Sequence, residues 1–211
     1  MQYYLEQVQT ICIFRGIVML SQEEQPFAIF KICLIGQGGV GKTCIANRLC
    51  FDTFDLNTKL TIGINFYSYK IPILVGEGDE SFVTLSLWDF GGQEQFKRLF
   101  PYYINGANAI LAIFSVVDMQ TLIGLDWWYK HLFNHNHRET PRILIGSKQD
   151  LVGNKAKSPV DDLVIKRFMD RHKETNFERT SSKDNVNITK IFRDMAERLL
   201  KLNDFEYLRL L

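Results

Sequence analysis

The fold of this chain is decided by Gly36-Gln37-Gly38-Gly39-Val40-Gly41-Lys42-Thr43. The spacing fits the phosphate-binding pattern G-x-x-x-x-G-K-[ST], and the flanking residues give the pattern its weight. Residues 27–35 are rich in β-branched and aromatic side chains, as expected of a buried strand. Residues 44–50 carry apolar side chains at helical spacing. A strand, a glycine turn and a helix in this order aim backbone N–H groups and a helix N-terminus at phosphate oxygens.

This context predicts a nucleotide-binding loop. Glycine permits positive φ and lets a ligand approach the backbone where a Cβ would obstruct it. We expect Lys42 to reach the β- and γ-phosphates and the Thr43 hydroxyl to coordinate Mg²⁺. The other residues of this stretch expected to contact the nucleotide are Gly36, Gly38, Gly39, Val40, Gly41 and Cys44.

Length and composition are those of one globular domain with short extensions. The chain has 211 residues, of which 46% are hydrophobic and 23% charged. We expect an N-terminal extension at 1–26, a nucleotide-binding domain at 27–203 and a short C-terminal tail at 204–211. The net charge of +1 implies no general affinity for polyanions, so no nucleic acid is expected as a partner. The four cysteines show no paired metal spacing, which favours reduced thiols and a cytoplasmic location.

The first twenty residues do not look like a targeting segment. They are too polar to span a membrane, and they lack the basic start and cleavage site of a signal peptide. Gln2 stands where myristoylation needs glycine, and the last residues contain no cysteine for prenylation, so no lipid anchor is evident. An added strand, a surface helix, and sequence upstream of a true start at Met19 all remain open for this segment.

Strand and helix patterns alternate along the rest of the chain. Two strands, 67–74 and 82–88, are separated by a short turn and are expected to pair as an antiparallel hairpin, with Pro72 on the edge or at an irregularity. The later segments are a strand at 108–116, a helix at 120–133, a strand at 142–146, a helix at 161–171, a strand at 176–180 and a helix at 188–202. This order predicts an α/β fold with a mostly parallel sheet covered by helices on both faces.

Three further strand ends carry residues suited to a ligand site. Asp89 closes an apolar strand, and a carboxylate there can hold Mg²⁺ through its water shell, because a hard cation prefers oxygen. Gly92 can offer its N–H to a γ-phosphate. Asp150, in Ser147-Lys148-Gln149-Asp150, is suited to accept both N–H groups on the edge of guanine. The Lys148 stem is expected to lie over the base, and backbone N–H groups of Ser181-Ser182-Lys183 to meet the guanine oxygen.

Together these motifs resemble the Ras superfamily of small GTPases from about Phe27 to Leu202. Residues 61–66 and 85–89 look most like the Rab branch, while Asp89-Phe90-Gly91-Gly92-Gln93 is also similar to the Arf and Roc branches. The resemblance implies a P-loop NTPase G domain with a six-stranded, mostly parallel sheet, one antiparallel edge hairpin and helices on both faces.

The resemblance also implies a molecular switch that binds GTP and GDP with Mg²⁺ and slowly hydrolyses GTP. Thr61 would complete the Mg²⁺ shell with Thr43 and Asp89, and hydrolysis would release the segments around Thr61 and Gly92. Gln93 would orient the attacking water, so Gln93, Lys42 and Thr61 are the expected catalytic residues. Phe54 is expected among the nucleotide contacts. Exchange factors, GTPase-activating proteins and effectors are expected at residues 55–66 and 92–103, and membranes would be reached through such partners.

The sequence departs from the family pattern in two of its motifs, and the change at Ser182 is a small one. Ser147 stands where the guanine motif usually begins with Asn, and Ser182 where Ala is usual. A serine can still tether neighbouring segments, but its shorter contact is expected to weaken nucleotide retention. No arginine lies between Asp52 and Leu60 to act in cis. Such an arginine is worth roughly three to five orders of magnitude in rate, so unaided turnover is expected to be slow.

Two other functions compete with a hydrolysing switch. One is a nucleotide-bound scaffold that does not hydrolyse GTP, against which the presence of Gln93, Thr61 and Lys42 argues. The other is a Roc-like GTPase module of a larger protein. A metal site at His131 and His135, one helical turn apart, is a weaker alternative, because no carboxylate stands at matching spacing and a solvated helix end explains the pair.

Overall fold

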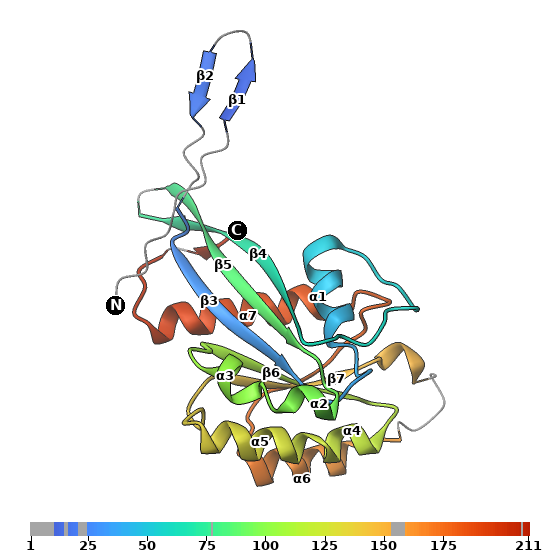
Figure 1. Cartoon of the computed structure of the whole chain (residues 1–211). Coiled ribbons are helices and arrows are strands. Elements are labelled where there is room, and N and C mark those ends of the chain that lie inside the picture. The colour runs from blue at the N-terminus through green and yellow to red at the C-terminus, as the bar shows by residue number, and fades with distance from the viewer. Residues whose placement is uncertain (1–10, 15–16, 21–24, 77, 153–158, 208) are drawn as a thin grey trace.

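A computed structural model describes residues 11–14, 17–20, 25–76, 78–152, 159–207 and 209–211 (Figure 1). The strands are β1 (Ile11–Phe14), β2 (Ile17–Leu20), β3 (Ala28–Ile35), β4 (Ile64–Val75), β5 (Asp79–Phe90), β6 (Ala109–Ser115), β7 (Arg142–Ser147), β8 (Phe177–Arg179) and β9 (Arg209–Leu210). The helices are α1 (Lys42–Phe51), α2 (Glu94–Lys97), α3 (Phe100–Ile104), α4 (Met119–Ile123), α5 (Leu125–Asn134), α6 (Asp162–His172) and α7 (Ile188–Leu202), with a 3₁₀ turn at Gln149–Leu151.

The large sheet has seven strands in the order β8-β7-β6-β3-β5-β4-β9. Strands β5, β3, β6, β7 and β8 run parallel, whereas β4 pairs antiparallel with β5 as the predicted hairpin. The α/β class and the mostly parallel sheet are therefore confirmed. The predicted count of six strands is wrong by one, because β9 pairs with β4 and adds a seventh strand at the edge.

Side chains of the central strand β3 alternate between two cores. Ile32 and Leu34 pack in the core under α1 and α7, while Cys33 and Ile35 pack in the core under α3, α5 and α6. All four side chains are fully buried. A strand covered on both faces needs apolar residues at every position, which is why residues 27–35 show no polar alternation. The helices therefore cover both faces of the sheet, as predicted (Figure 1).

Strand β9 pairs with the edge of β4 that carries Pro72. Pro72 lies in β4, and its carbonyl accepts a hydrogen bond from the Leu211 N–H at 2.8 Å. The missing N–H of Pro72 consequently faces β9 and not β5, where proline would interrupt the hairpin ladder. The Leu211 carbonyl, which proline cannot serve, accepts a 2.6 Å hydrogen bond from the Arg193 guanidinium of α7. This arrangement places Pro72 near the sheet edge, as the sequence indicated.

The helix expected at residues 120–133 is divided in two. Asp118 caps α4 by accepting a hydrogen bond from the Gln120 N–H, and α4 ends at Gly124, from which α5 begins. A Cβ on Gly124 would stand 1.9 Å from the side-chain nitrogen of Gln37. Glycine at position 124 thus leaves room for a side chain of the phosphate loop, a long-range contact that helical periodicity does not report. Helices α2 and α3 also follow Gln93, where the sequence patterns showed no element.

Part of the predicted N-terminal extension forms strands. β1 and β2 pair antiparallel as a separate two-stranded sheet, while residues 1–10, 15–16 and 21–24 lie outside the described residues. The boundaries of the extension and of the domain stay predictions. Within the part of the chain that the structure describes, none of the helices is both long and apolar enough to cross a membrane.

The contribution of β9 can be tested at Leu210, whose side chain is buried in the core under α1 and α7. We expect Leu210→Ala to lower the free energy of unfolding by about 2 kcal/mol, at the small end of the range for buried leucines because an edge strand can relax. The melting temperature of the nucleotide-loaded protein should fall by about 4–8 °C. Leu202→Ala, at a position 59% exposed, is the matched control and should change it little. Equal melting temperatures for the two variants would show that β9 contributes no packing.

Candidate functional site

The phosphate loop lies at the carboxyl end of β3 and leads directly into α1. Gly36 has φ 141°, and a Cβ there would lie 2.2 Å from the Ile113 carbonyl oxygen of β6. Gly41, at the start of α1, has φ 99°. Both positions therefore require glycine, one for close packing against the neighbouring strand and both for backbone conformation. Among the described residues, no side chain caps the start of α1 at Gly41. The first N–H groups of a helix have no partner within the helix, and this arrangement binds anions.

Lys42 is buried beneath this loop. Its ammonium donates hydrogen bonds to the carbonyl oxygens of Gly36 at 2.9 Å and Gln37 at 2.8 Å. Burial lowers the pKa of Lys42 to about 8, and the negative charge of Asp89 opposes that shift. A cation that is already desolvated and held by the loop is well placed to receive a polyphosphate, because its charge is poorly compensated by the protein alone.

Three side-chain oxygens meet beside Lys42. The Thr43 hydroxyl donates to Asp89 Oδ2 at 2.6 Å and lies 2.7 Å from the Thr61 hydroxyl, which in turn lies 3.3 Å from Asp89 Oδ2. Burial raises the pKa of Asp89, and the hydrogen bond from Thr43 acts in the opposite direction. The other carboxylate oxygen of Asp89, Oδ1, is buried and receives no hydrogen bond from the residues that the structure describes. A carboxylate oxygen left free beside two hydroxyls fits a hard divalent cation such as Mg²⁺.

The segment after β5 lies directly against the phosphate loop. A Cβ on Gly92 would stand 2.3 Å from the Gln37 carbonyl carbon and 2.4 Å from the Gly38 nitrogen. The Gly91 N–H donates to the Gly63 carbonyl at 2.8 Å, which joins this segment to the one that carries Thr61. Gln93 follows, with its Cγ 3.8 Å from where a Cβ on Gly38 would be. Glycine at position 92 is therefore what allows the two segments and the loop to meet.

At the other end of the site, Ser147 joins the loop to the sheet. Its buried hydroxyl lies 2.5 Å from the Val40 carbonyl oxygen and 2.8 Å from the Phe114 carbonyl oxygen. A serine hydroxyl carries one proton, so it donates to only one of these acceptors at a time. The expected tether through Ser147 is thus present. At any one time its hydroxyl donates to only one of the two carbonyl oxygens, those of Val40 and Phe114.

Asp150 and the turn after β8 are held together. The Ser181 hydroxyl donates to Asp150 Oδ1 at 2.7 Å, which orients the carboxylate. The Arg48 guanidinium of α1 donates to the Ser182 carbonyl at 2.7 Å and to the Lys183 carbonyl at 3.3 Å. One arginine therefore positions this turn against the helix that starts at the phosphate loop.

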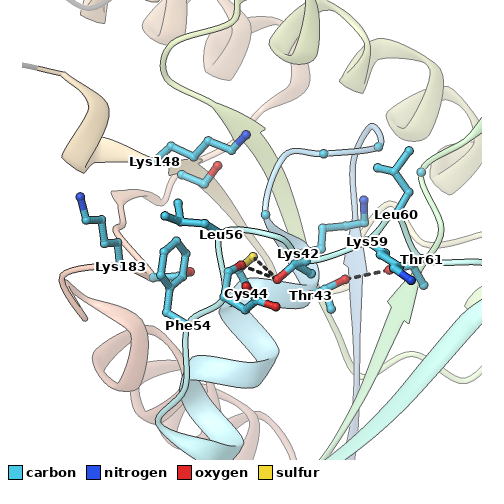
Figure 2. Close-up of a pocket in the computed structure, with 18 of the residues that line it drawn as sticks. Lys42, Thr43, Cys44, Phe54, Leu56, Lys59, Leu60, Thr61, Lys148 and Lys183 are labelled. Carbon is cyan, nitrogen blue, oxygen red and sulfur yellow. Dashed lines mark hydrogen bonds between the residues drawn. The ribbon is translucent and has the colours of Figure 1, made fainter.

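All these segments surround one cavity (Figure 2). The predicted site residues that line it are Gly38, Gly39, Gly41, Lys42, Thr43, Cys44, Phe54, Thr61, Gly92, Gln93, Ser147, Lys148, Asp150, Ser182 and Lys183. Four others, Gly36, Val40, Asp89 and Ser181, stand behind that lining and contact it through the hydrogen bonds given above. The structure thus brings every predicted site residue to one place.

Some residues that line the cavity were not predicted from the sequence. The additional lining residues are Asp55, Leu56, Thr58, Lys59, Leu60 and Leu151. All but Leu151 lie at residues 55–60, which were expected only as part of the partner surface at 55–66. No local motif marks them, although their position just before Thr61 was an available signal. Figure 2 shows Phe54, Lys148 and Lys183 at one end of the cavity and Lys59, Leu60 and Thr61 at the other.

The histidine pair is engaged by its own helix. His131 Nδ1 lies 2.8 Å from the Trp127 carbonyl oxygen, and His135 Nδ1 lies 2.7 Å from the His131 carbonyl oxygen. The His131 ring also stacks on Trp127, with ring centroids 3.7 Å apart. No cluster of three or more potential His, Cys, Asp or Glu metal ligands occurs in the residues that the structure describes. These contacts agree with a capped helix end.

Comparison with known proteins agrees with the geometry. The model of the Ras family matches residues 31–201. The chain is 31% identical over 175 residues to Ras-related protein Rab-10 of Diplobatis ommata, covering 82% of each chain. It is 33% identical over 171 residues to GTP-binding protein ypt1 of Schizosaccharomyces pombe, covering 81% of this chain and 80% of that protein. It is 34% identical over 172 residues to Ras-related protein Rab-13 of Rattus norvegicus, covering 82% and 80%. With the phosphate loop, the oxygen cluster and the base-end turn around one cavity, these matches show that the chain belongs to the Ras family and is a Rab-like small GTPase.

Proposed function

We propose that this GTPase is a Mg²⁺-dependent switch that alternates between GTP and GDP, hydrolyses GTP slowly without a partner, and regulates vesicle trafficking. One observation carries the proposal: Thr43, Thr61 and Asp89 present their oxygens together beside the buried cation of Lys42. Thr43 belongs to the phosphate loop, Asp89 to the sheet, and Thr61 to a loop without regular structure. We expect the loop that carries Thr61 to move away from the site when Mg²⁺ and the γ-phosphate are lost.

The residues divide the work along the cavity. The loop glycines, Lys42 and Gly92 would bind the phosphates, and Gln93 would orient water for attack on the γ-phosphate. Thr43, Thr61 and Asp89 would hold Mg²⁺, which when bound offsets the negative charge of the β- and γ-phosphates. Asp150 and Lys148 would select guanine, with Phe54 and the turn at Ser181 to Lys183 closing that end. Gln93 lines the cavity beside Gly38, and this favours a hydrolysing switch over a scaffold.

Switching would act through the contacts between mobile and fixed segments. Thr61 contacts Thr43, and Gly92 packs on the backbone of Gln37 and Gly38. Loss of the γ-phosphate removes a shared ligand of both segments, so both are expected to relax together through the Gly91–Gly63 hydrogen bond. Exchange factors, activating proteins and effectors would read this change at residues 55–66 and 92–103. Several large apolar side chains are exposed there, namely Leu56, Leu60, Ile62, Phe66, Leu99 and Tyr102.

Trafficking and location are carried over from the likeness to the Rab branch. We infer that the protein acts in the cytoplasm and reaches membranes through its partners.

The first test removes the phosphate cation and the hydroxyl ligand. Lys42→Ala should weaken GTP and GDP by at least about 100-fold, because a charge-assisted contact to buried phosphate is worth roughly 3 kcal/mol or more. Thr43→Asn should weaken GTP more than GDP. Titration calorimetry with Mg²⁺ measures both, and Lys166→Ala, at an exposed position of α6, is the control. Unchanged GTP affinity in both site variants would refute the proposed function.

A second test concerns the tether at position 147. An asparagine amide has two N–H donors and can serve the Val40 and Phe114 carbonyls together, whereas the serine hydroxyl serves one. Ser147→Asn should therefore slow release of a fluorescent GDP analogue by about fivefold, the equivalent of one net hydrogen bond of roughly 1 kcal/mol. Release at the original rate or faster would mean that Ser147 does not limit nucleotide retention.

A third test uses the contact between Gly92 and the loop. Gly92→Ala places a methyl group 2.3–2.4 Å from loop backbone atoms, so the segment must move away from the γ-phosphate position. We expect hydrolysis in a single turnover to fall by at least about tenfold, as for loss of one transition-state donor. GDP affinity, which does not need this contact, should stay within about twofold and serves as the internal control. Equal loss of GDP affinity and hydrolysis would indicate general damage to the site instead.

A further inference from the structure

Lys59 is a cation in the cavity to which no role has been assigned above. It lies in the loop between α1 and β4, two residues before Thr61. It is among the residues that line the nucleotide cavity, at the end that holds Thr61 and Leu60 (Figure 2). The loop contains no arginine, and a lysine at this point supplies the same charge.

Among the residues that the structure describes, none forms an ion pair with Lys59. Within the described part of the chain its ammonium forms no hydrogen bond and no ion pair with any residue. The nearest acid in the sequence, Asp55, instead accepts a hydrogen bond from the Asn57 N–H at 2.8 Å. Lys42 is held by loop carbonyls, and Lys148 and Lys183 stand at the base end. Lys59 is therefore a free cation at the phosphate end of the cavity.

The backbone on both sides of Lys59 is anchored to α1. The Thr58 hydroxyl donates to the Asp55 carbonyl at 2.6 Å and lies 3.7 Å from the Cys44 thiol. Two residues beyond Lys59, the Thr61 hydroxyl lies 2.7 Å from that of Thr43. Cys44 and Thr43 are neighbours in the first turn of α1. Lys59 thus lies between two residues whose side chains contact the first turn of α1.

The residue that follows also fixes the direction of this loop. Leu60 Cδ2 lies 3.6 Å from the position that a Cβ on Gly38 would take, and Gln93 Cγ lies 3.8 Å from the same point. Leu60 and Gln93 therefore meet over the third residue of the phosphate loop. Because Lys59 precedes Leu60, its backbone lies at the same mouth, where the γ-phosphate is expected.

The charges that line the cavity need an anion. The lining contains Lys42, Lys59, Lys148 and Lys183 against Asp55 and Asp150, a net charge of +2 from four cations and two acids. Lys148 and Lys183 stand at the base end, so Lys42 and Lys59 are the two lysines of this lining at the phosphate end. A polyphosphate with a bound metal ion still carries negative charge at its terminal oxygens, and that charge shifts toward the leaving group during hydrolysis.

We propose that Lys59 is a catalytic residue of GTP hydrolysis, supplied by the same chain, whose ammonium contacts the γ-phosphate and the β–γ bridging oxygen. This rests on the proposed function, since it requires GTP in the cavity. The water oxygen bonds to the γ-phosphorus as the bond from the γ-phosphorus to the bridging oxygen breaks. The electron pair of that bond stays on the GDP oxygen, and the water proton ends on phosphate. Lys59 donates hydrogen bonds throughout and transfers no proton.

The expected size of the effect is set by the nature of lysine. Its ammonium is strongly hydrated and its stem flexible, so it gains less from preorganisation than a planar guanidinium does. Lys59 is also exposed to solvent. An effect of about tenfold on the hydrolysis rate is therefore expected, well below the roughly thousandfold or more of an arginine finger.

The test compares Lys59→Gln and Lys59→Arg in the full chain without any partner protein. Hydrolysis is followed in a single turnover of bound GTP, and affinities for GDP and for a non-hydrolysable GTP analogue are measured by calorimetry. Binding of aluminium fluoride to the GDP form adds a readout of the transition state, because such mimics bind through contacts made only there. Lys166→Gln, the loss of one exposed positive charge on α6, is the matched control.

Lys59→Gln should hydrolyse GTP about tenfold more slowly and lose aluminium fluoride binding, with GDP affinity within about twofold. Lys59→Arg should restore both, and Lys166→Gln should behave as the original protein. The proposal is overturned if Lys59→Gln hydrolyses at the original rate, or if both affinities fall while the bound nucleotide still turns over normally. If the original protein binds no GTP, the proposed function fails first, which separates the two failures.

Discussion

The hydrogen bond from the Thr43 hydroxyl to Asp89 Oδ2, 2.6 Å long, is the contact on which the site depends. It joins the start of α1 to the end of β5, and so connects the phosphate loop with the strand beside it. Thr61 reaches the same carboxylate oxygen from a third segment. Because Asp89 is fully buried, its charge is acceptable only with such donors or a cation close by. Thr43 and Thr61 thus compensate the charge of one buried carboxylate from two different segments.

Much of this was visible in the sequence because the relevant signals are local. The phosphate loop, Asp89, the guanine motif and the turn at Ser181 each follow a strand, and strands of a parallel sheet end at one edge. Once the alternation of strands and helices was recognised, the meeting of these residues in space followed from topology alone. Helix α7 begins and ends at the predicted residues, because its apolar positions repeat over four turns without interruption.

The features that escaped prediction depend on distant partners. Helices α4 and α5 meet at Gly124, where Gln37, far away in the sequence, occupies the space that a Cβ would take. β9 is too short to show any alternation, and its pairing depends on the outward edge of β4. Lys59 carries no motif, since its position at the cavity mouth comes from Thr58 and Thr61 on either side. Periodicity and spacing report the local preference of a segment. These three features instead depend on contacts with residues elsewhere in the fold.

The pairing of β9 with β4 also places a constraint on the order of folding during synthesis. β4 and the whole nucleotide site precede β9 in the chain, so a nascent protein can assemble its ligand cavity while the far end of β4 is still uncovered. An unpaired strand edge is a template for association with other chains. Pro72 removes one donor from that edge before β9 exists, and the Arg193 guanidinium later takes the place of the missing N–H. Pro72 therefore costs one hydrogen bond between β4 and β9, but it also disfavours association of the unpaired β4 edge with other chains.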